Sequence, residues 1–405
     1  MVFIRSSRFA EVRYEIRGPL SEEARVLEEA GRTVLRLNTG DPAAFGFRPP
    51  PAFLAEVLLR ARHSNGYSDA RGLLESRQAV AEWYRAQGVA DVGAGDVVLG
   101  NGTSELIAMA LQALLEPGDE VLVPSPDYPA WTANTSFASG RPVHYRCDES
   151  AGWLPDLDDL AARVTSRTRA VVLINPNNPT GAVYPGETVE GVLEIARRHG
   201  LMVLSDEVYD RILYDGAVHQ RPAALGPDVV CLTFGSLSKS YRVAGFRAGW
   251  VVLSGHRSSA RDYFEGLLAL ASLRVCANTL GQCAVEVALA DPESRGTLNL
   301  ALPGARLHQQ REQAWKRLTA IPGVSCVKPM GAVYAFARLD PEVYKIHDDG
   351  RLALDLLRSK RVQIVQGTGF NWPAPDHFRM LTLPRVEVID TAVNRIERFL
   401  ADYVQ

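Results

Sequence analysis

The middle of the chain alternates between short apolar runs and amphipathic helical segments, and this alternation constrains the fold more than any other feature. The runs are DVVLG (96–100), DEVLVPS (119–125), AVVLINP (170–176), LMVLSDE (201–207), VVCLTFG (229–235) and GWVVLS (249–254). Between two of them, residues 185–200 place Val189, Val192 and Leu193 at helical spacing before the stop signal Gly200. Near-continuous apolar strands that alternate with such helices predict an α/β fold, a mainly parallel sheet covered on both faces.

The last third of the chain has a different pattern and predicts a smaller α+β domain. Residues 304–321 form a long polar helical pattern, and residues 323–339 predict two strands joined by a Pro/Gly turn. Residues 361–367 predict another strand, residues 377–384 alternate as a half-exposed strand does, and a closing helix is expected at 388–404. We therefore expect an N-terminal arm with part of the small domain at 1–48, a large domain at 49–289 and a small C-terminal domain at 290–405.

The composition of the chain excludes several classes of function. A hydrophobic fraction of 46%, a charged fraction of 22% and a net charge of −3 predict a soluble globular protein with no nucleic-acid or membrane partner. The five scattered cysteines form no Cys/His cluster, so neither a disulfide frame nor a metal site is expected. The first residues lack the pattern of a signal peptide and no apolar run is long enough to span a membrane, which predicts a cytoplasmic protein.

Several of the predicted strands end in polar residues, and ligands bind beyond the carboxyl ends of parallel strands. After the first strand, Gly102 makes a turn and Thr103 or Ser104 begins a helix, which indicates either a phosphate site or a simple helix cap. Asp206 emerges from an apolar strand and needs a cationic partner, whereas Tyr209 either shares its face or packs in the core. The nearby acidic residues Glu207 and Asp210 are expected to be solvated.

Lys239 is the first lysine of the chain and follows another of these strands. Ser236 and Ser238 precede it and Arg247 follows it, a combination of hydroxyls and a guanidinium that suits a dianion. A lysine amine, unlike a guanidinium, can lose its proton and attack a carbonyl. The segment therefore suggests a phosphorylated carbonyl cofactor held as a Schiff base.

The motifs NPNNPTG, DEVY and SLSK, followed by the downstream arginine in this order, resemble the class I, fold-type-I pyridoxal-phosphate aminotransferases. The longer segments PSPDYPAWTA, SKSYRVAGFRAGW and QGTGFNWPAPDHFR are similar to bacterial alanine (glutamate–pyruvate) aminotransferases. The resemblance covers nearly the whole chain. It implies pyridoxal 5'-phosphate as cofactor, a ping-pong exchange of an amino group between an L-amino acid and a 2-oxo acid, and a homodimer with shared active sites.

The resemblance also implies a role for individual residues. Lys239 would bind the cofactor and move protons, Asp206 would pair with the pyridinium nitrogen, and Tyr128 would stack on the ring. Tyr209 and Asn178 would contact the phenolic oxygen. The phosphate would be held by Gly102, Thr103, Ser236, Ser238 and Arg247, with Tyr67 reaching the phosphate of the neighbouring subunit.

On the substrate side, the resemblance implies that Arg379 clamps the α-carboxylate, helped by Asn178 and the backbone at Gly40. Arg17 either binds a distal carboxylate or lies on the surface. Thr39 and Asp41 depart from the pattern of the alanine aminotransferases. Asp41 either favours a cationic 2-oxo acid or points to solvent.

Three functions remain open on the sequence alone. Alanine and glutamate with pyruvate and 2-oxoglutarate are the first expectation. The alternative is the same reaction on an unusual basic or cyclic amino acid, and a pyridoxal-phosphate-dependent β-lyase or oxidase ranks below both.

Overall fold

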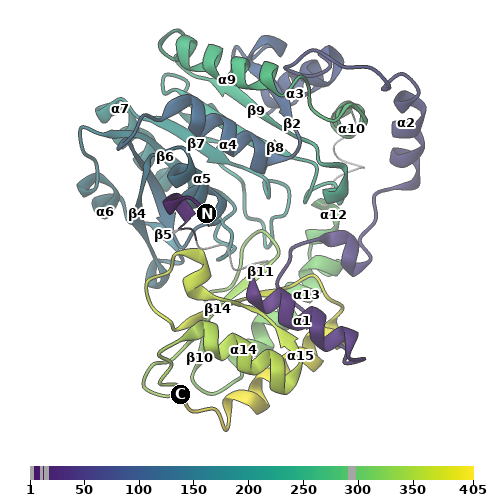
Figure 1. Cartoon of the computed structure of the whole chain (residues 1–405), viewed down its shortest axis with the longest axis vertical. Helices are drawn as coiled ribbons and strands as arrows, with labels where there is room; N and C mark the ends of the chain where they lie inside the picture. The colour runs from purple at the N-terminus through teal and green to yellow at the C-terminus, as the bar shows by residue number, and fades with distance from the viewer. Residues whose placement is uncertain (1–3, 10–11, 13–17, 291–297) are drawn as a thin grey trace.

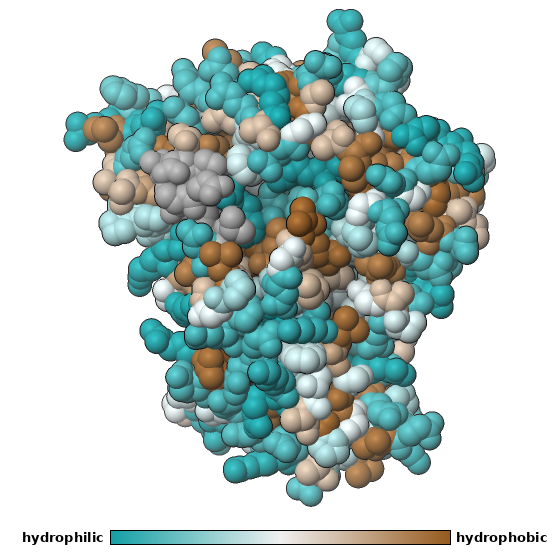
Figure 2. Space-filling model, turned by 180° about the vertical axis from the view of Figure 1, so that it is seen from behind, coloured by the Kyte–Doolittle hydropathy of each residue, from teal (hydrophilic) through white to brown (hydrophobic). Residues whose placement is uncertain are grey.

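The computed structural model describes residues 4–9, 12, 18–290 and 298–405. Its upper half holds a large sheet between two layers of helices, and its lower half holds a small sheet with helices packed on it (Figure 1). The C-terminus lies at the bottom. Figure 2 shows the molecule from behind, with a hydrophilic recess at mid-height bordered below by a group of hydrophobic residues.

The large sheet has eight strands in the order β2-β9-β8-β7-β6-β3-β4-β5. The ladders between β4, β3, β6, β7 and β8 are parallel, whereas β9 runs antiparallel to both of its neighbours. The strands are β2 (Val97–Gly100), β3 (Glu120–Ser125), β4 (Arg141–Asp148), β5 (Leu154–Pro155), β6 (Thr168–Ile174), β7 (Met202–Asp206), β8 (Cys231–Ser236) and β9 (Gly249–Ser254). All six strands that the sequence predicts for this sheet are confirmed, and the sequence analysis missed the other two, β4 and β5.

Helices cover both faces of this sheet, as the continuous apolar strands predicted. Alternate residues of one strand enter different cores: Val171 and Leu173 pack on one face, and Val172 and Ile174 on the other. The helices of this half are α2 (Pro51–Ala61), α3 (Leu74–Ala86), α4 (Thr103–Leu114), α5 (Ala130–Phe137), α6 (Leu157–Ala162), α7 (Gly186–His199), α8 (Pro222–Leu225), α9 (Arg261–Leu273) and α10 (Thr279–Ala290).

The small sheet is antiparallel, with the order β10-β11-β14-β13. Its strands are β10 (Val324–Cys326), β11 (Tyr334–Leu339), β13 (Val365–Gln366) and β14 (His377–Leu381), and a separate parallel pair joins β1 (Leu35–Arg36) to β12 (Val362–Gln363). The accompanying helices are α1 (Pro19–Glu29), α12 (Leu298–Ala301), α13 (Arg306–Thr319), α14 (Asp349–Lys360) and α15 (Val386–Leu400). A large parallel-rich sheet and a smaller α+β unit confirm the predicted fold class, and the domain boundaries stay a prediction.

The prediction of a half-exposed strand at 377–384 is wrong, because every residue of β14 is buried. The strand lies inside the small sheet, between β11 and β13. Its polar residues His377 and Arg379 alternate with apolar ones, but they face the large half of the molecule instead of solvent. In the sequence, a strand whose polar face is buried shows the same alternation as a strand whose polar face is exposed to solvent.

The expectation that Glu207 and Asp210 are solvated is also wrong. Glu207 is 1% exposed and forms an ion pair with Arg221, which also contacts Asp210 at 2.7 Å. His219 lies 3.2 Å from the same Glu207 carboxylate. Burial raises the pKa of Glu207, but the Arg221 charge and the contact with His219 outweigh burial and lower that pKa overall. A buried network therefore supports the end of β7.

Removing Arg221 tests this network. We expect Arg221→Ala to lower the free energy of unfolding by about 3–5 kcal/mol, because it leaves the Glu207 charge buried and without its guanidinium. Arg261→Ala is the matched control, since Arg261 is 84% exposed and pairs with Glu265 along one helix. The control should lose less than about 0.5 kcal/mol. Equal losses in urea unfolding would contradict the assignment.

No helix among the described residues is long and apolar enough to cross a membrane.

Candidate active site

Four chain segments end at one edge of the large sheet. Strands β6, β7 and β8 are parallel neighbours, and β2 runs in their direction because both β2 and β8 are antiparallel to β9. The residues that follow these strands therefore meet beyond the same edge. A cavity of about 480 Å³ lies there.

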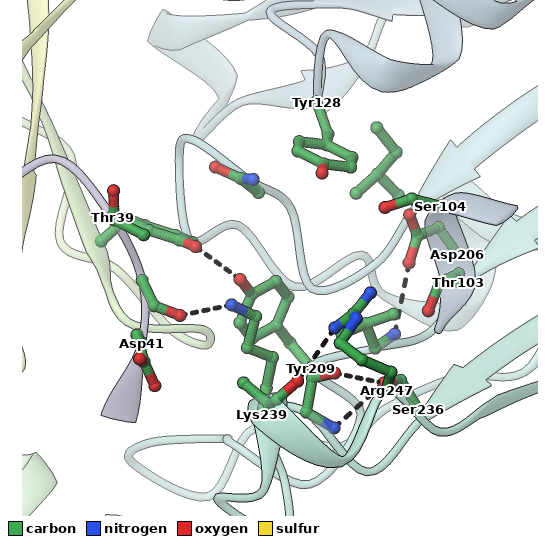
Figure 3. Close-up of a pocket in the computed structure, with 18 of the residues that line it drawn as sticks. Thr39, Asp41, Thr103, Ser104, Tyr128, Asp206, Tyr209, Ser236, Lys239 and Arg247 are labelled. Carbon is green, nitrogen blue, oxygen red and sulfur yellow. Dashed lines mark hydrogen bonds between the residues drawn. The ribbon is translucent and has the colours of Figure 1, made fainter. Parts of the chain in front are cut away.

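Most of the predicted site residues line this cavity (Figure 3). They are Gly40, Thr103, Tyr128, Asn178, Asp206, Tyr209, Ser236, Ser238, Lys239, Arg247 and Arg379, together with Thr39 and Asp41. Gly102 directly precedes Thr103 in the chain. Tyr67 lies on the surface with 86% of its area exposed, and Arg17 lies outside the described residues. The structure thus brings together residues that are far apart in the sequence.

One side of the cavity suits an anion. The α4 helix begins at Thr103, and the hydroxyl of Ser236 donates to that of Ser238 at 2.8 Å. The guanidinium of Arg247 donates to two carbonyl oxygens, those of Ala244 and Asn101, and pairs with no carboxylate of the described chain. Its positive charge therefore remains available together with the helix N-terminus.

Gly102 makes this arrangement possible. Its φ is +84°, which favours glycine, and a Cβ atom at this position would collide with the guanidinium of Arg247. The backbone of residue 102 and the arginine can approach each other only because that atom is missing.

Asp206 provides a buried carboxylate on the same side of Lys239 as Arg247 (Figure 3). The indole Nε1 of Trp131 donates to Asp206 Oδ2 at 3.0 Å, and no cationic side chain of the described residues forms an ion pair with this carboxylate. Burial raises the pKa of Asp206 to about 6, and the Trp131 hydrogen bond opposes that rise. A ligand with a protonated ring nitrogen would supply the missing charge.

The other side of the cavity carries the Arg379 guanidinium, which is 1% exposed. Arg379 donates to Asn178 Oδ1 at 2.8 Å and to the carbonyl oxygen of Asn38. Lys239 Nζ donates to the carbonyl oxygen of Gly40, and Figure 3 shows its side chain between the Thr39–Asp41 segment and Arg247. The lysine amine therefore lies between the two polar ends of the cavity.

The sequence analysis missed Tyr334 and Trp131. Tyr334 belongs to β11 of the small sheet, and its hydroxyl lies 2.5 Å from that of Tyr209. The centroid of its ring lies 4.3 Å from the Arg379 guanidinium carbon, and a Cβ on Gly40 would collide with its hydroxyl. Nothing in the sequence distinguishes Tyr334 from a core aromatic, because its role depends on how the two sheets meet.

Asp41 lies at the cavity wall, and one oxygen of its carboxylate accepts a hydrogen bond from the backbone N–H of Ala43 at 3.0 Å. It thereby caps the short 3-10 helix η3 (Pro42–Phe45). The carboxylate therefore has a local structural role in addition to its place at the cavity.

Comparisons with known proteins identify the family to which the chain belongs. The family model "Aminotransferase class I and II" matches residues 32–396. Glutamate-pyruvate aminotransferase AlaA of Escherichia coli is 52% identical over 401 residues, 99% of this chain and 98% of the relative. An alanine aminotransferase of Mycobacterium bovis is 52% identical over 404 residues, 100% of this chain and 94% of the relative. A crystal structure of an aminotransferase from Escherichia coli has a TM-score of 0.98 at 51% identity and covers 100% of both chains.

The fold places a cavity lined by both acidic and basic side chains at the edge of a doubly covered sheet. The chain belongs to the class I and II aminotransferases. It is a transaminase, whose substrates are amino acids and oxo acids.

Replacing the buried carboxylate should stabilise the protein. In protein prepared without any bound ligand, we expect Asp206→Asn to raise the free energy of unfolding at pH 8 by up to about 3 kcal/mol, from a pKa near 6 against the usual 3.8. The raised pKa means that the folded state binds this proton more tightly. Stability from Asp206 is therefore present at low pH and lost as the pH rises through about 6.

Urea unfolding of the wild-type and Asp206→Asn proteins between about pH 4 and 8 measures this difference. The difference should vanish near pH 4. Asp127, whose pKa burial raises to about 7, contributes equally to both proteins and cancels. A variant that is less stable than the wild type at pH 8 would contradict the assignment.

Proposed function

We propose that this transaminase uses pyridoxal 5'-phosphate and exchanges the amino group between alanine and glutamate and their 2-oxo acids, by a ping-pong mechanism. The observation that carries the proposal is the Asp206 carboxylate, buried without a cationic partner among the described residues, in the same cavity as the uncompensated Arg247 guanidinium. A ligand that satisfies both must carry a protonated nitrogen and an anionic group. Pyridoxal phosphate has a pyridinium and a phosphate.

The cavity residues fit this cofactor. Gly102, Thr103, Ser236, Ser238 and Arg247 would hold the phosphate, because they combine a glycine turn, a helix N-terminus, hydroxyls and a guanidinium. When bound, pyridoxal phosphate supplies an aldehyde for amines and a ring that withdraws the electron pair from the α carbon.

Five side chains would act on the ring. The Asp206 carboxylate would pair with the protonated ring nitrogen, and Trp131 keeps that carboxylate oriented. Tyr128 lines the cavity where it would stack on the ring. Burial raises the pKa of Tyr209 well above its usual value, so its hydroxyl stays protonated and would donate to the phenolic oxygen, assisted by Asn178.

Lys239 and Arg379 act on the substrate. Arg379 binds the α-carboxylate, and Asn178 orients the guanidinium through the hydrogen bond at 2.8 Å. The Lys239 amine would hold the cofactor between turnovers, and its Nζ would take the proton from the substrate α carbon. Both residues are buried or partly buried, which excludes water from the proton transfer.

The substrate proposal follows the relatives named as glutamate-pyruvate and alanine aminotransferases. Asp41 at the cavity wall favours a second candidate, a basic amino acid, because a carboxylate there repels an acidic side chain.

The half-reaction of the enzyme with a single amino acid distinguishes the two substrate candidates. If the first is correct, alanine and glutamate should each be converted to their 2-oxo acids. If only a basic amino acid reacts, the second candidate is correct. Pyruvate with ammonia, or consumption of oxygen, would instead indicate a lyase or an oxidase.

We expect Lys239→Ala and Lys239→Arg to abolish transamination, because neither side chain offers a neutral amine. Borohydride reduction followed by peptide mass mapping should attach the pyridoxyl group to the peptide of Lys239 in the wild type and to no peptide in the variants. Lys345→Ala, at an exposed lysine, is the control and should keep full activity. Substantial turnover by Lys239→Ala would refute the role of this lysine.

The proposal includes a homodimer in which Tyr67 reaches the partner's phosphate. Tyr67 is 86% exposed, and its loop lies beside the start of α10, where Thr279 donates to the Ser64 carbonyl at 2.7 Å. Leu280 on that helix is 54% exposed. Exposed large apolar side chains that gather on adjoining segments favour a contact with a second copy.

Leu280→Asp tests the dimer. Asp in the first turn of a helix is favourable, so the variant should fold normally and yet place a charge in the contact. We expect its mass in sedimentation to shift from dimer to monomer, with weaker binding of pyridoxal phosphate. Val388→Asp, a change in the first turn of α15, should stay dimeric. A monomeric wild type would contradict the shared site.

A further inference from the structure

Two side chains of β14 reach from the small sheet to the large half of the molecule. His377 and Arg379 are two residues apart on the strand and therefore lie on the same face. Arg379 contacts Asn178, which follows β6, and His377 Nε2 lies 3.4 Å from Oε1 of Glu149. Glu149 begins the 3-10 turn η5 (Glu149–Ala151), directly after β4. Both positions thus tie the small sheet to segments that follow strands of the large sheet.

The His377 side chain is completely buried in an aromatic box. Its ring stacks on Phe336 with centroids 4.7 Å apart. Trp153 and Trp372 meet it edge-on at 5.4 Å and 5.2 Å. The box fixes the orientation of the imidazole, so its two nitrogens point to defined partners.

Those partners are carboxylates. Nδ1 of His377 lies 2.7 Å from Oδ1 of Asp376, and Nε2 faces Glu149. Arg338 is the other charged group at this place, with its Nε 3.5 Å from Asp376 and its Nη1 3.9 Å from Glu149. Two carboxylates and one guanidinium leave a net negative charge, which a protonated imidazole neutralises.

The charges decide the protonation of His377. Burial lowers the pKa of an imidazole, but here the hydrogen bonds and charges of Asp376 and Glu149 outweigh burial and raise the pKa of His377 above 6.5. The stabilisation is therefore fully present below pH 6.5 and is lost as the pH rises through the folded-state pKa.

We propose that His377 is a positioning residue whose imidazolium, held between Asp376 and Glu149, clasps β14 to the large half and keeps Arg379 opposite Asn178. The inference rests on the proposed function, in which Arg379 binds the substrate carboxylate. Loss of the clasp loosens the strand that carries Arg379 without removing any group that touches the substrate. It therefore acts on substrate binding more than on the chemical step.

The first test compares KM and kcat for alanine between about pH 6 and 9 in the holoenzyme. His377→Gln keeps a donor for Asp376 but carries no charge, and Glu149→Gln removes the charge from the other half of the clasp. Each should raise KM at pH 6 by about three- to thirtyfold with little change in kcat. In the wild type, KM should rise with pH as His377 loses its proton, and the variants should lack this rise.

Two further variants complete the test. The double variant His377→Gln with Glu149→Gln should be no worse than the single variants, because both remove the same interaction. His347→Gln, at an exposed histidine of the small half, should behave like the wild type. A folded His377→Gln enzyme with the wild-type pH profile of KM would overturn the proposal.

A second readout does not depend on activity. A protonated imidazole quenches a neighbouring indole, so tryptophan emission of the holoenzyme should rise as His377 loses its proton, from the contacts with Trp153 and Trp372. His377→Gln should lack this transition and His347→Gln should keep it. A wild type that does not transaminate contradicts the proposed function. The fluorescence titration then tests, independently of activity, whether His377 is protonated between Asp376 and Glu149. Absence of the transition in an active wild type contradicts the clasp.

Discussion

The parallel hydrogen-bonded ladder of β6, β7 and β8 is the constraint on which the rest of the structure depends. Because these strands share one direction, Asn178, Asp206 and Ser236 all emerge at one edge of the sheet. Strand β9 is antiparallel to both β8 and β2, so β2 runs in the same direction as β8 and the N-terminus of α4 joins them. A reversal of any of these strands would carry its polar group to the opposite edge.

The ladder provides only half of the site, since the arginine proposed to bind the substrate carboxylate arrives from the small sheet. Arg379 and Tyr334 sit on paired strands β14 and β11, and Asn38 and Gly40 belong to the segment after β1. The two sheets must therefore keep their relative position within hydrogen-bonding tolerance. Buried polar contacts across the boundary do this, namely Arg379 with Asn178, Tyr334 with Tyr209, and the His377 clasp.

The site also shows how a protein prepares for a charged ligand. Asp206 is held ready without a cationic partner, and Glu207, one residue later, is neutralised by Arg221. The buried Glu207 network supports the strand end, while Asp206 faces the cavity. The buried, unpaired Asp206 carboxylate lowers the stability of the folded protein, and a bound pyridinium would restore that stability.

Six of the eight strands of the large sheet, and the helix at 185–200, followed from the sequence because their apolar periodicity is local. Lys239, Asp206 and Asn178 lie at or shortly after the ends of parallel strands and so meet at one edge. Periodicity could not reveal that β14 is buried on both faces, that Glu207 pairs with Arg221, or that Trp131 and Tyr334 join the site. Those features depend on contacts between residues far apart in the chain, and only the packing of the two sheets decided them.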